Sequence, residues 1–191
     1  MQPSGQGREC AADIHDWEEN MNRRDVLVFS AIVALGIGVL PSNAIAQQRT
    51  LKEQLVGTWT LVSAETYAQD GTKSALFGAD PKGILILDAG GRFAQIQVRS
   101  DRPRFKSSNR LEGTPEENKA ALAGGVGQFG TWSVNEPDKT LNVHMDGVVH
   151  FPNEEGTDQQ RSVSVTADEL KVINFQSRAG GRAELVYKRA K

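Results

Sequence analysis

The sequence of 191 residues has a single cysteine, Cys10, which lies in its N-terminal quarter. A disulfide needs two cysteines, and so does a CxxC redox motif. Residues 47–191 therefore contain no disulfide, no thiol nucleophile and no cysteine metal ligand. The stability of this part of the chain must come from packing alone.

Long apolar runs are also scarce, and the one clear example lies near the N-terminus. Val26 to Leu40 is apolar, but it contains two glycines and is shorter than the about 20 residues that a membrane-spanning helix needs. The run predicts a cleaved export signal over residues 21–46 and no stable membrane anchor. Cleavage after Ala46 would leave Gln47 as the first residue.

The flanks of this run are typical of exported bacterial proteins. Asn22-Arg23-Arg24-Asp25 supplies a charged start, and Ala44-x-Ala46 is a small-residue exit for signal peptidase. The arginine pair resembles a twin-arginine signal, and general secretion remains the alternative route. Residues 1–20 are polar and mixed in charge, so we predict that they are a non-native upstream extension and that Met21 is the true start. Either route predicts a periplasmic or secreted protein.

Neither sign of charge is in large excess. The chain has 22 Lys and Arg residues and 24 Asp and Glu residues, and 19 and 18 of these remain when residues 1–46 are set aside. This balance argues against nucleic acid as a partner. Residues 47–191 have the length of one domain with one core.

From Leu55 onward the pattern is all-β. Short alternating runs rich in β-branched and aromatic residues are separated by turn signals such as Asp70-Gly71 and Gly90-Gly91. Tight turns of this kind join antiparallel neighbours. The expected strands are Gly57 to Thr66, Gly83 to Asp88, Arg92 to Arg99, Gln128 to Val134, Thr140 to Met145, Val148 to His150, Ser162 to Thr166, Glu169 to Phe175 and Arg182 to Arg189.

One segment has helix signals instead. Thr114 is a suitable N-cap, Pro115 fits the first helical position, and Gly124-Gly125 ends the run. We expect one short inserted helix here. About eight to nine short strands are most economically closed into an antiparallel barrel, since closure removes exposed edges, and a sandwich is the alternative.

Several segments carry a family resemblance. They are Gly57-Thr58-Trp59, Asp70-Gly71-Thr72, Phe77-Gly78-x-Asp80-Pro81, Thr114-Pro115-Glu116-Glu117, Phe129-Gly130-Thr131-Trp132 and Phe151-Pro152-Asn153-x-x-Gly156-Thr157-Asp158-Gln159-x-Arg161. In this order they resemble the bacterial and fungal lipocalin-like domain family, whose barrels are related to lipocalins and fatty-acid-binding proteins. The resemblance covers residues 55–189 and implies a lipocalin-like β-barrel. Glu154 departs from it, because that position often holds a tryptophan or another bulky residue.

The resemblance also implies a structural pair. In such barrels the tryptophan of the first strand, here Trp59, plugs the closed end, and a cationic residue of the last strand lies across its indole. Arg189 is the candidate and Lys188 the second choice. A cation over an indole contributes roughly 0.5 to 2 kcal/mol, so the pair is structural.

The sequence contains no specific catalytic motif, neither a G-x-S-x-G elbow nor a phosphate-binding glycine loop. His144 and His150 are the histidines outside residues 1–46, and no further ligand spacing makes them a metal site, so we predict no metal and no cofactor. In the expected strand Thr140 to Met145, His144 and Asn142 share one face. Leu141, Val143 and Met145 share the other face. An inward His144 would orient a ligand or act as a general base, and an outward one would be solvated.

Arg161 is the other polar candidate. If buried, it needs a carboxylate partner or an anionic ligand head group, as in fatty-acid-binding barrels, and the alternative is a stabilising pair with Asp158 or a neighbouring strand. His144 and Arg161 are the candidate catalytic residues. The same two residues with His150, Phe129 and Trp132 form the predicted ligand-binding set.

A cluster of basic residues precedes the expected helix. Arg99, Arg102, Arg104, Lys106 and Arg110 surround Phe105, and only Asp101 opposes them. The cluster would suit an anionic ligand or lipid head group, or it is a solvated loop at the barrel mouth that acts as a lid with the helix.

Two functions follow from this pattern. The first is an exported barrel that holds a small hydrophobic or amphiphilic molecule in its lumen, for transport, sequestration or protection. The alternative is a cyclase, isomerase or hydrolase that uses the same cavity, with His144 as acid or base and Arg161 as an electrostatic stabiliser. A filled barrel that binds another protein is a third possibility, and the oligomeric state is left open.

Overall fold

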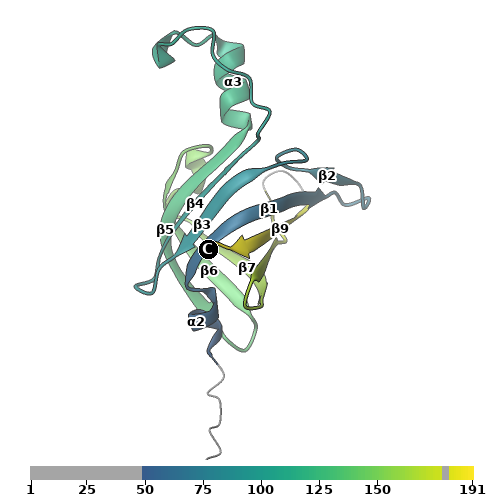
Figure 1. The fold of residues 1–191 in the computed structure, drawn as a ribbon, viewed down its shortest axis with the longest axis vertical. Coiled ribbons are helices and arrows are strands. Elements are labelled where there is room, and N and C mark those ends of the chain that lie inside the picture. The colour runs from purple at the N-terminus through teal and green to yellow at the C-terminus, as the bar shows by residue number, and fades with distance from the viewer. Residues whose placement is uncertain (1–48, 178–180) are drawn as a thin grey trace, which may run out of the picture. The chain divides into compact units, whose positions relative to one another are not determined.

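The computed structural model describes residues 49–177 and 181–191 (Figure 1). They belong to one compact unit, Gln48–Lys191. The predicted upstream extension (1–20) and export signal (21–46) lie outside the described residues. No helix within the described ranges is both long enough and apolar enough to cross a lipid bilayer.

The architecture is a closed antiparallel barrel. Nine strands form one sheet in the order β2-β1-β3-β4-β5-β6-β7-β8-β9, and β1 also pairs with β9. Eight strands therefore close the barrel, and β2 is an extra strand on its edge, which confirms the predicted all-β lipocalin-like fold. The strands are β1 (Gly57–Tyr67), β2 (Lys73–Ala75), β3 (Lys82–Leu87), β4 (Arg92–Val98), β5 (Gly125–Asn135), β6 (Thr140–Val148), β7 (Asp158–Val165), β8 (Glu169–Asn174) and β9 (Arg182–Arg189).

Within residues 49–177 and 181–191, the short helical elements are α2 (Leu51–Leu55), η2 (Arg110–Glu112), α3 (Pro115–Ala123) and η3 (Pro152–Glu154). The inserted helix is confirmed as α3. At its start, the Thr114 side chain accepts a hydrogen bond from the Glu117 backbone N–H. The Glu117 side chain accepts one from the Thr114 backbone N–H in return. This reciprocal capping satisfies two donors that the first turn leaves without a helical partner.

The sequence prediction differs from the structure at one expected strand and at four short elements that it did not contain, β2, α2, η2 and η3. The expected separate strand from Val148 to His150 is wrong, because β6 continues unbroken to Val148 and the chain then bends. A bulge between Phe129 and Gly130 adjusts the register, so that β5 stays paired with β6 along this extra length.

The core lies inside the barrel and follows the alternation of the strands. On β6, for example, Leu141, Val143 and Met145 are buried while their neighbours are more exposed. The buried apolar side chains form one cluster: Leu55, Trp59, Leu61, Ala64, Phe77, Leu85, Leu87, Phe93, Trp132, Leu141, Val143, Met145, Val148, Val163, Leu170, Val172, Ala183, Leu185 and Tyr187.

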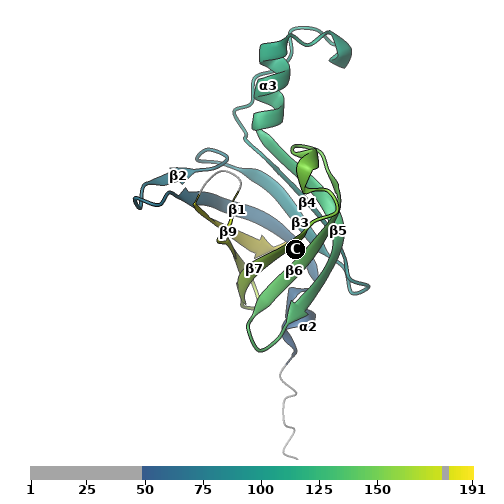
Figure 2. The ribbon, with the colours of Figure 1, turned by 180° about the vertical axis from the view of Figure 1, so that it is seen from behind.

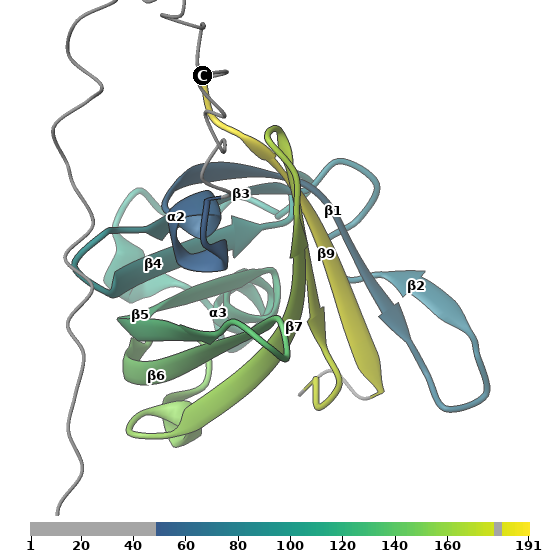
Figure 3. The same ribbon diagram turned by 90° about the horizontal axis from the view of Figure 1, so that it is seen from below.

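One end of the barrel, which we call the closed end, is covered by α2 (Figure 3). Trp59 is fully buried there and donates from Nε1 to the Leu55 carbonyl at 2.8 Å. The Arg189 guanidinium lies 4.0 Å from the centroid of the Trp59 ring, which is the pair that the sequence predicted. Its nitrogens donate to three carbonyls, those of Gln54, Val56 and Ala167. One arginine therefore fastens α2 to the last strand.

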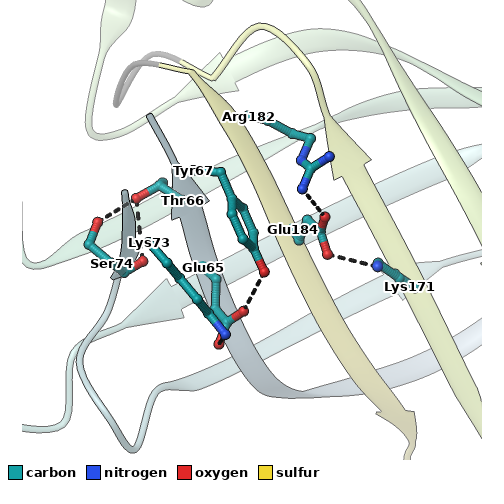
Figure 4. A network of polar contacts seen from close by, with 8 residues as sticks. All are labelled: Glu65, Thr66, Tyr67, Lys73, Ser74, Lys171, Arg182 and Glu184. Carbon is teal, nitrogen blue, oxygen red and sulfur yellow. Dashed lines mark hydrogen bonds and ion pairs between the residues drawn. The ribbon is translucent and has the colours of Figure 1, made fainter. Parts of the chain in front are cut away.

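On the outer face, where β1 meets β9, two carboxylates lie opposite each other (Figure 4). Glu65 is paired with Lys73 at 2.7 Å, and this contact lowers the pKa of its carboxyl below the ordinary value. Glu184 is paired with both Lys171 and Arg182 at 2.7 Å. The network ties β2, β1, β9 and β8 together from outside, and it directs both acids away from the lumen.

Candidate functional site

A cavity of about 530 Å³ occupies the half of the barrel away from the closed end. It opens at what we call the mouth, where Phe77, α3 and η3 lie. Part of its wall is apolar, from Leu76, Phe77, Val126, Leu122 and Leu185. The remaining wall is polar, so the cavity is amphipathic.

The polar wall is organised around Gln95 of β4. Its side-chain oxygen accepts from Gln128 Nε2 at 2.7 Å and from Arg161 Nη1 at 3.0 Å. Its side-chain nitrogen donates to the Tyr187 hydroxyl at 3.2 Å, and Gln97 Nε2 donates to the same hydroxyl at 2.5 Å. Residues of four strands are thus joined in one buried network, which fixes their positions beneath the cavity.

Arg161 is the one positive charge in this network. It is 7% exposed, and its Nη2 donates to the Gln159 side chain at 3.1 Å, so both terminal nitrogens contact neutral amides. The Nε–H is buried and has no hydrogen-bond partner. Burial lowers the pKa of Arg161, and the nearby Glu154 carboxylate acts in the opposite direction. An unsatisfied buried donor is costly, and a ligand acceptor would relieve that cost.

Asp158, one of the alternative partners considered for Arg161, does not contact it, and the guanidinium instead donates to Gln95 and Gln159. Asp158 and Arg161 are three apart on β7, and since successive side chains of a strand alternate between faces, they point to opposite sides of the sheet. Asp158 lies on the exposed side, where its carboxylate contacts His144 Nδ1 at 2.8 Å.

His144 therefore lies outside the barrel, and it does not line the cavity. Its side chain is 43% exposed, with a second carboxylate, that of Asp146, at 3.9 Å from Nε2. The sequence had left its face open, and the apolar residues of β6 settle the choice because they occupy the interior. His144 is consequently not placed to orient a ligand in the lumen or to act there as a general base.

Two further members of the predicted ligand-binding set are also placed elsewhere. Phe129 is 48% exposed on the outer face of β5. Trp132 points inward but lies near the closed end, where its Nε1 donates to the Asp88 carbonyl at 3.0 Å and Lys52 of α2 lies over its ring. Neither residue lines the cavity.

His150 and Glu154 do line the cavity, next to Arg161. The Nδ1 atom of His150 is buried without a hydrogen-bond partner. Glu154 is 4% exposed, so the position at which the family often carries a bulky side chain here places a carboxylate at the lumen. Of the five predicted ligand-binding residues, the structure brings together Arg161 and His150.

The sequence analysis missed Gln95, Gln97, Gln128 and Tyr187. A signal for them was present in the alternation, because Gln95 and Gln97 share the inward parity of Phe93, and Tyr187 shares that of Leu185. A polar residue at an inward position of a strand is a candidate for the lumen. Among the described residues there is no group of three or more His, Cys, Asp or Glu side chains suited to hold a metal ion.

The buried phenol of Tyr187 predicts a loss of stability at alkaline pH. Burial raises the pKa of Tyr187 above its ordinary value, since the neutral form is favoured in the network. The stabilisation is complete below about pH 10, where the phenol is neutral in both states. Above that pH only the unfolded chain ionises, and the free energy of unfolding should fall by about 1.4 kcal/mol per pH unit.

The measurement is a spectrophotometric titration of a Tyr67→Phe protein, in which Tyr187 is the one remaining tyrosine. In the native protein Tyr67 donates to Glu65 on the outer face, away from the cavity. Ionisation of Tyr187 should coincide with the loss of the native circular dichroism signal. Ionisation near pH 10 in a protein that is still folded would show that the phenol is accessible to water.

The comparison with known families agrees with this geometry. A family model described as a lipocalin-like domain matches residues 56–190, from the start of β1 to the end of β9. No curated protein matches the sequence. The match covers well over half of the chain and the entire barrel, and the chain therefore belongs to the lipocalin-like domain family.

Proposed function

We propose that the protein is an exported lipocalin-like carrier that holds a small, partly apolar molecule in its lumen, with a hydrogen-bond acceptor group of the ligand directed at Arg161. The observation that carries the proposal is the buried guanidinium beside the cavity, with an Nε–H that no described group accepts. A carbonyl or carboxylate oxygen is the natural partner for such a donor.

The shape and lining of the cavity support the same conclusion. Its volume of about 530 Å³ lies within the roughly 300 to 1,000 Å³ of typical small-molecule sites. An apolar wall beside a few fixed polar groups binds an amphipathic molecule in one orientation. The glutamines of the network are already held by one another and by Tyr187, so little ordering is required when the ligand binds.

The support for export comes from the sequence. Residues 21–46 have the charged start, the apolar run and the small-residue exit of a signal peptide, and the arginine pair favours the twin-arginine route over general secretion. We infer a periplasmic or secreted protein that begins at Gln47 and acts as carrier, store or protector of its ligand.

The enzyme alternative has less support. A cyclase, isomerase or hydrolase was expected to use His144 as its acid or base, and the exterior position of His144 removes that group from the cavity. Arg161 stabilises charge but does not supply or remove a proton near neutral pH, and an enzyme would have to use His150 or Glu154 of the cavity lining in place of His144. The carrier is accordingly the function that we propose.

The test is native mass spectrometry of the protein purified from the periplasm of its own host. A mass excess that disappears on denaturation is expected, and the denatured mass reports whether Gln47 is the first residue. In an Arg161→Met protein the retained ligand should be lost, because a hydrogen bond to a charged group contributes about 1.5 to 3 kcal/mol, or roughly tenfold to a hundredfold in affinity.

A matched control is His144→Ala, which removes another predicted ligand-binding side chain, one that lies on the outer face of the same barrel. It should retain the ligand. Arg161→Met should melt at a lower temperature than the native protein, because it removes two hydrogen bonds to buried amides and the cation near the buried Glu154 carboxylate, so its fold is checked by circular dichroism. A folded Arg161→Met protein that keeps its ligand at full occupancy would contradict the proposal.

A further inference from the structure

The connection between β4 and β5, residues 99–124, extends beyond the mouth of the barrel (Figures 1 and 2). We call it the basic protrusion. It is an ordered element, because the Arg99 backbone N–H donates to the Gly124 carbonyl at its base and the Lys106 backbone N–H donates to the Glu117 side chain further out. The Phe105 ring packs so closely on Gly113 that a Cβ there would lie 2.4 Å from it.

Most of the basic side chains of the protrusion form no ion pair with the residues that the structure describes. Arg99 is paired with Asp101. The other basic residues are exposed and form no ion pair with any described residue: Arg102, Arg104, Lys106, Arg110 and Lys119. Five separated cations on one projecting element make a surface that attracts anions.

The acids of the same element are mostly engaged in holding its shape. Glu112 accepts from the side chains of Ser107 and Asn109, and these hydrogen bonds lower the pKa of its carboxyl. Glu117 accepts from the backbone N–H groups of Thr114 and Lys106, which lower its pKa in the same way. Glu112 and Glu117 therefore serve local turns and caps, although Lys106 also acts on Glu117 by its charge. Residues 99–124 contain six basic and four acidic residues, so the protrusion keeps a net positive charge.

Exposed apolar side chains accompany the cations. Leu111 of η2 is 81% exposed and Leu122 of α3 is 53% exposed. Phe151, next to η3 and on the rim of the cavity with Leu122, is 42% exposed. Cations beside protruding leucine and phenylalanine side chains are the combination by which surface elements enter the interface of an anionic bilayer.

We infer that the basic protrusion docks on an anionic lipid surface, with Leu111 and Leu122 inserted between head groups and the arginines in contact with their phosphates. A nucleic acid is a poorer match, because Phe105, the one aromatic residue of the protrusion, is packed against Gly113 and offers no platform for a base. This inference holds whichever ligand the lumen binds, although Leu122 belongs both to the cavity wall and to the docking surface. Docking would bring the mouth of the cavity close to the lipid.

The experiment uses the Gln47–Lys191 protein, which contains the complete compact unit Gln48–Lys191. Cosedimentation is measured with phosphatidylcholine vesicles and with vesicles that also contain phosphatidylglycerol. Binding is expected with the anionic vesicles, and it should weaken as salt is added. Each basic residue near an anionic surface contributes about fivefold, so replacing Arg102, Arg104, Lys106 and Arg110 by glutamine should weaken binding by roughly 600-fold.

The control protein loses the same number of charges at the closed end, by replacement of Arg49, Lys52, Lys139 and Lys188 with glutamine. It should bind as the native protein does. A Leu111→Trp protein gives a second readout, because the native Trp59 and Trp132 are at most 5% exposed. Its added fluorescence should shift to the blue with anionic vesicles.

Three results would overturn the inference. They are equal binding to neutral and anionic vesicles, an equal loss of binding in the control protein, and an unshifted Leu111→Trp spectrum in bound protein. Tighter binding to a DNA duplex than to anionic vesicles at the same salt would assign the cations to nucleic acid instead.

Discussion

A Trp59→Ala protein is expected to lose about 4 kcal/mol of unfolding free energy, which is a large part of the roughly 5 to 15 kcal/mol available to a domain. Trp59 is fully buried, so alanine leaves a large cavity at the closed end. The change also deprives the Leu55 carbonyl of its 2.8 Å hydrogen bond and Arg189 of the ring beneath it. The measurement is urea denaturation followed by circular dichroism.

Milder variants keep this prediction testable if Trp59→Ala does not fold. Trp59→Phe retains a ring beneath Arg189 and should cost less than alanine. Arg189→Met removes the cation over the indole and three hydrogen bonds to carbonyls, and it should destabilise by about 2 kcal/mol. Lys188→Gln, the neighbouring exposed position, should change little. A cost below about 1 kcal/mol for Trp59→Ala would mean that the closed end is not part of the cooperative core.

A Gly130→Ala protein should be destabilised by about 3 kcal/mol or more, although the change adds one methyl group. A Cβ at Gly130 would lie 1.8 Å from the carbonyl oxygen of His144 and 2.9 Å from the backbone nitrogen of Asp146. Both obstacles are backbone atoms of β6, so they cannot rotate away and the bulge between β5 and β6 must move. The same denaturation experiment measures the effect.

Gly127→Ala is the matched control on the same strand. The nearest atom to a Cβ there is Val149 Cγ2 at 3.3 Å, and Val149 is 74% exposed and free to give way. Since alanine restricts the unfolded chain more than glycine does, Gly127→Ala should change stability by less than about 1 kcal/mol. Equal effects of the two substitutions would refute the argument from close backbone approach.

The features predicted correctly from sequence are those with a strong local or pairwise signal. The caps of α3 were visible as Thr114 and Pro115, and the pair of Trp59 and Arg189 followed from the family resemblance. Alternation on β6 separated two faces, but it did not say which face was inside. That choice depends on the whole barrel, which buries the face with more apolar area.

The features that were missed have little local signal, or they depend on contacts between residues far apart in the chain. The three residues of β2 are all exposed and show no alternation, so no pattern distinguishes them from a loop. The helix α2 has five residues, and its Thr50–Glu53 capping box was its one sequence mark. The network around Gln95 unites residues far apart in the chain, and their contact depends on the register of four strands.

The cover that α2, Trp59 and Arg189 place over one end has a kinetic consequence. Because the closed end is covered, a molecule that enters the cavity at the mouth, past Phe77, α3 and η3, must leave by the same route. A substitution at the mouth that does not contact the bound molecule would change the rates of entry and exit by the same factor and leave the equilibrium constant unaltered. The exit rate is the product of the entry rate constant and the dissociation constant, so the residence time depends on the mouth and on the cavity lining, whereas the affinity depends on the lining alone.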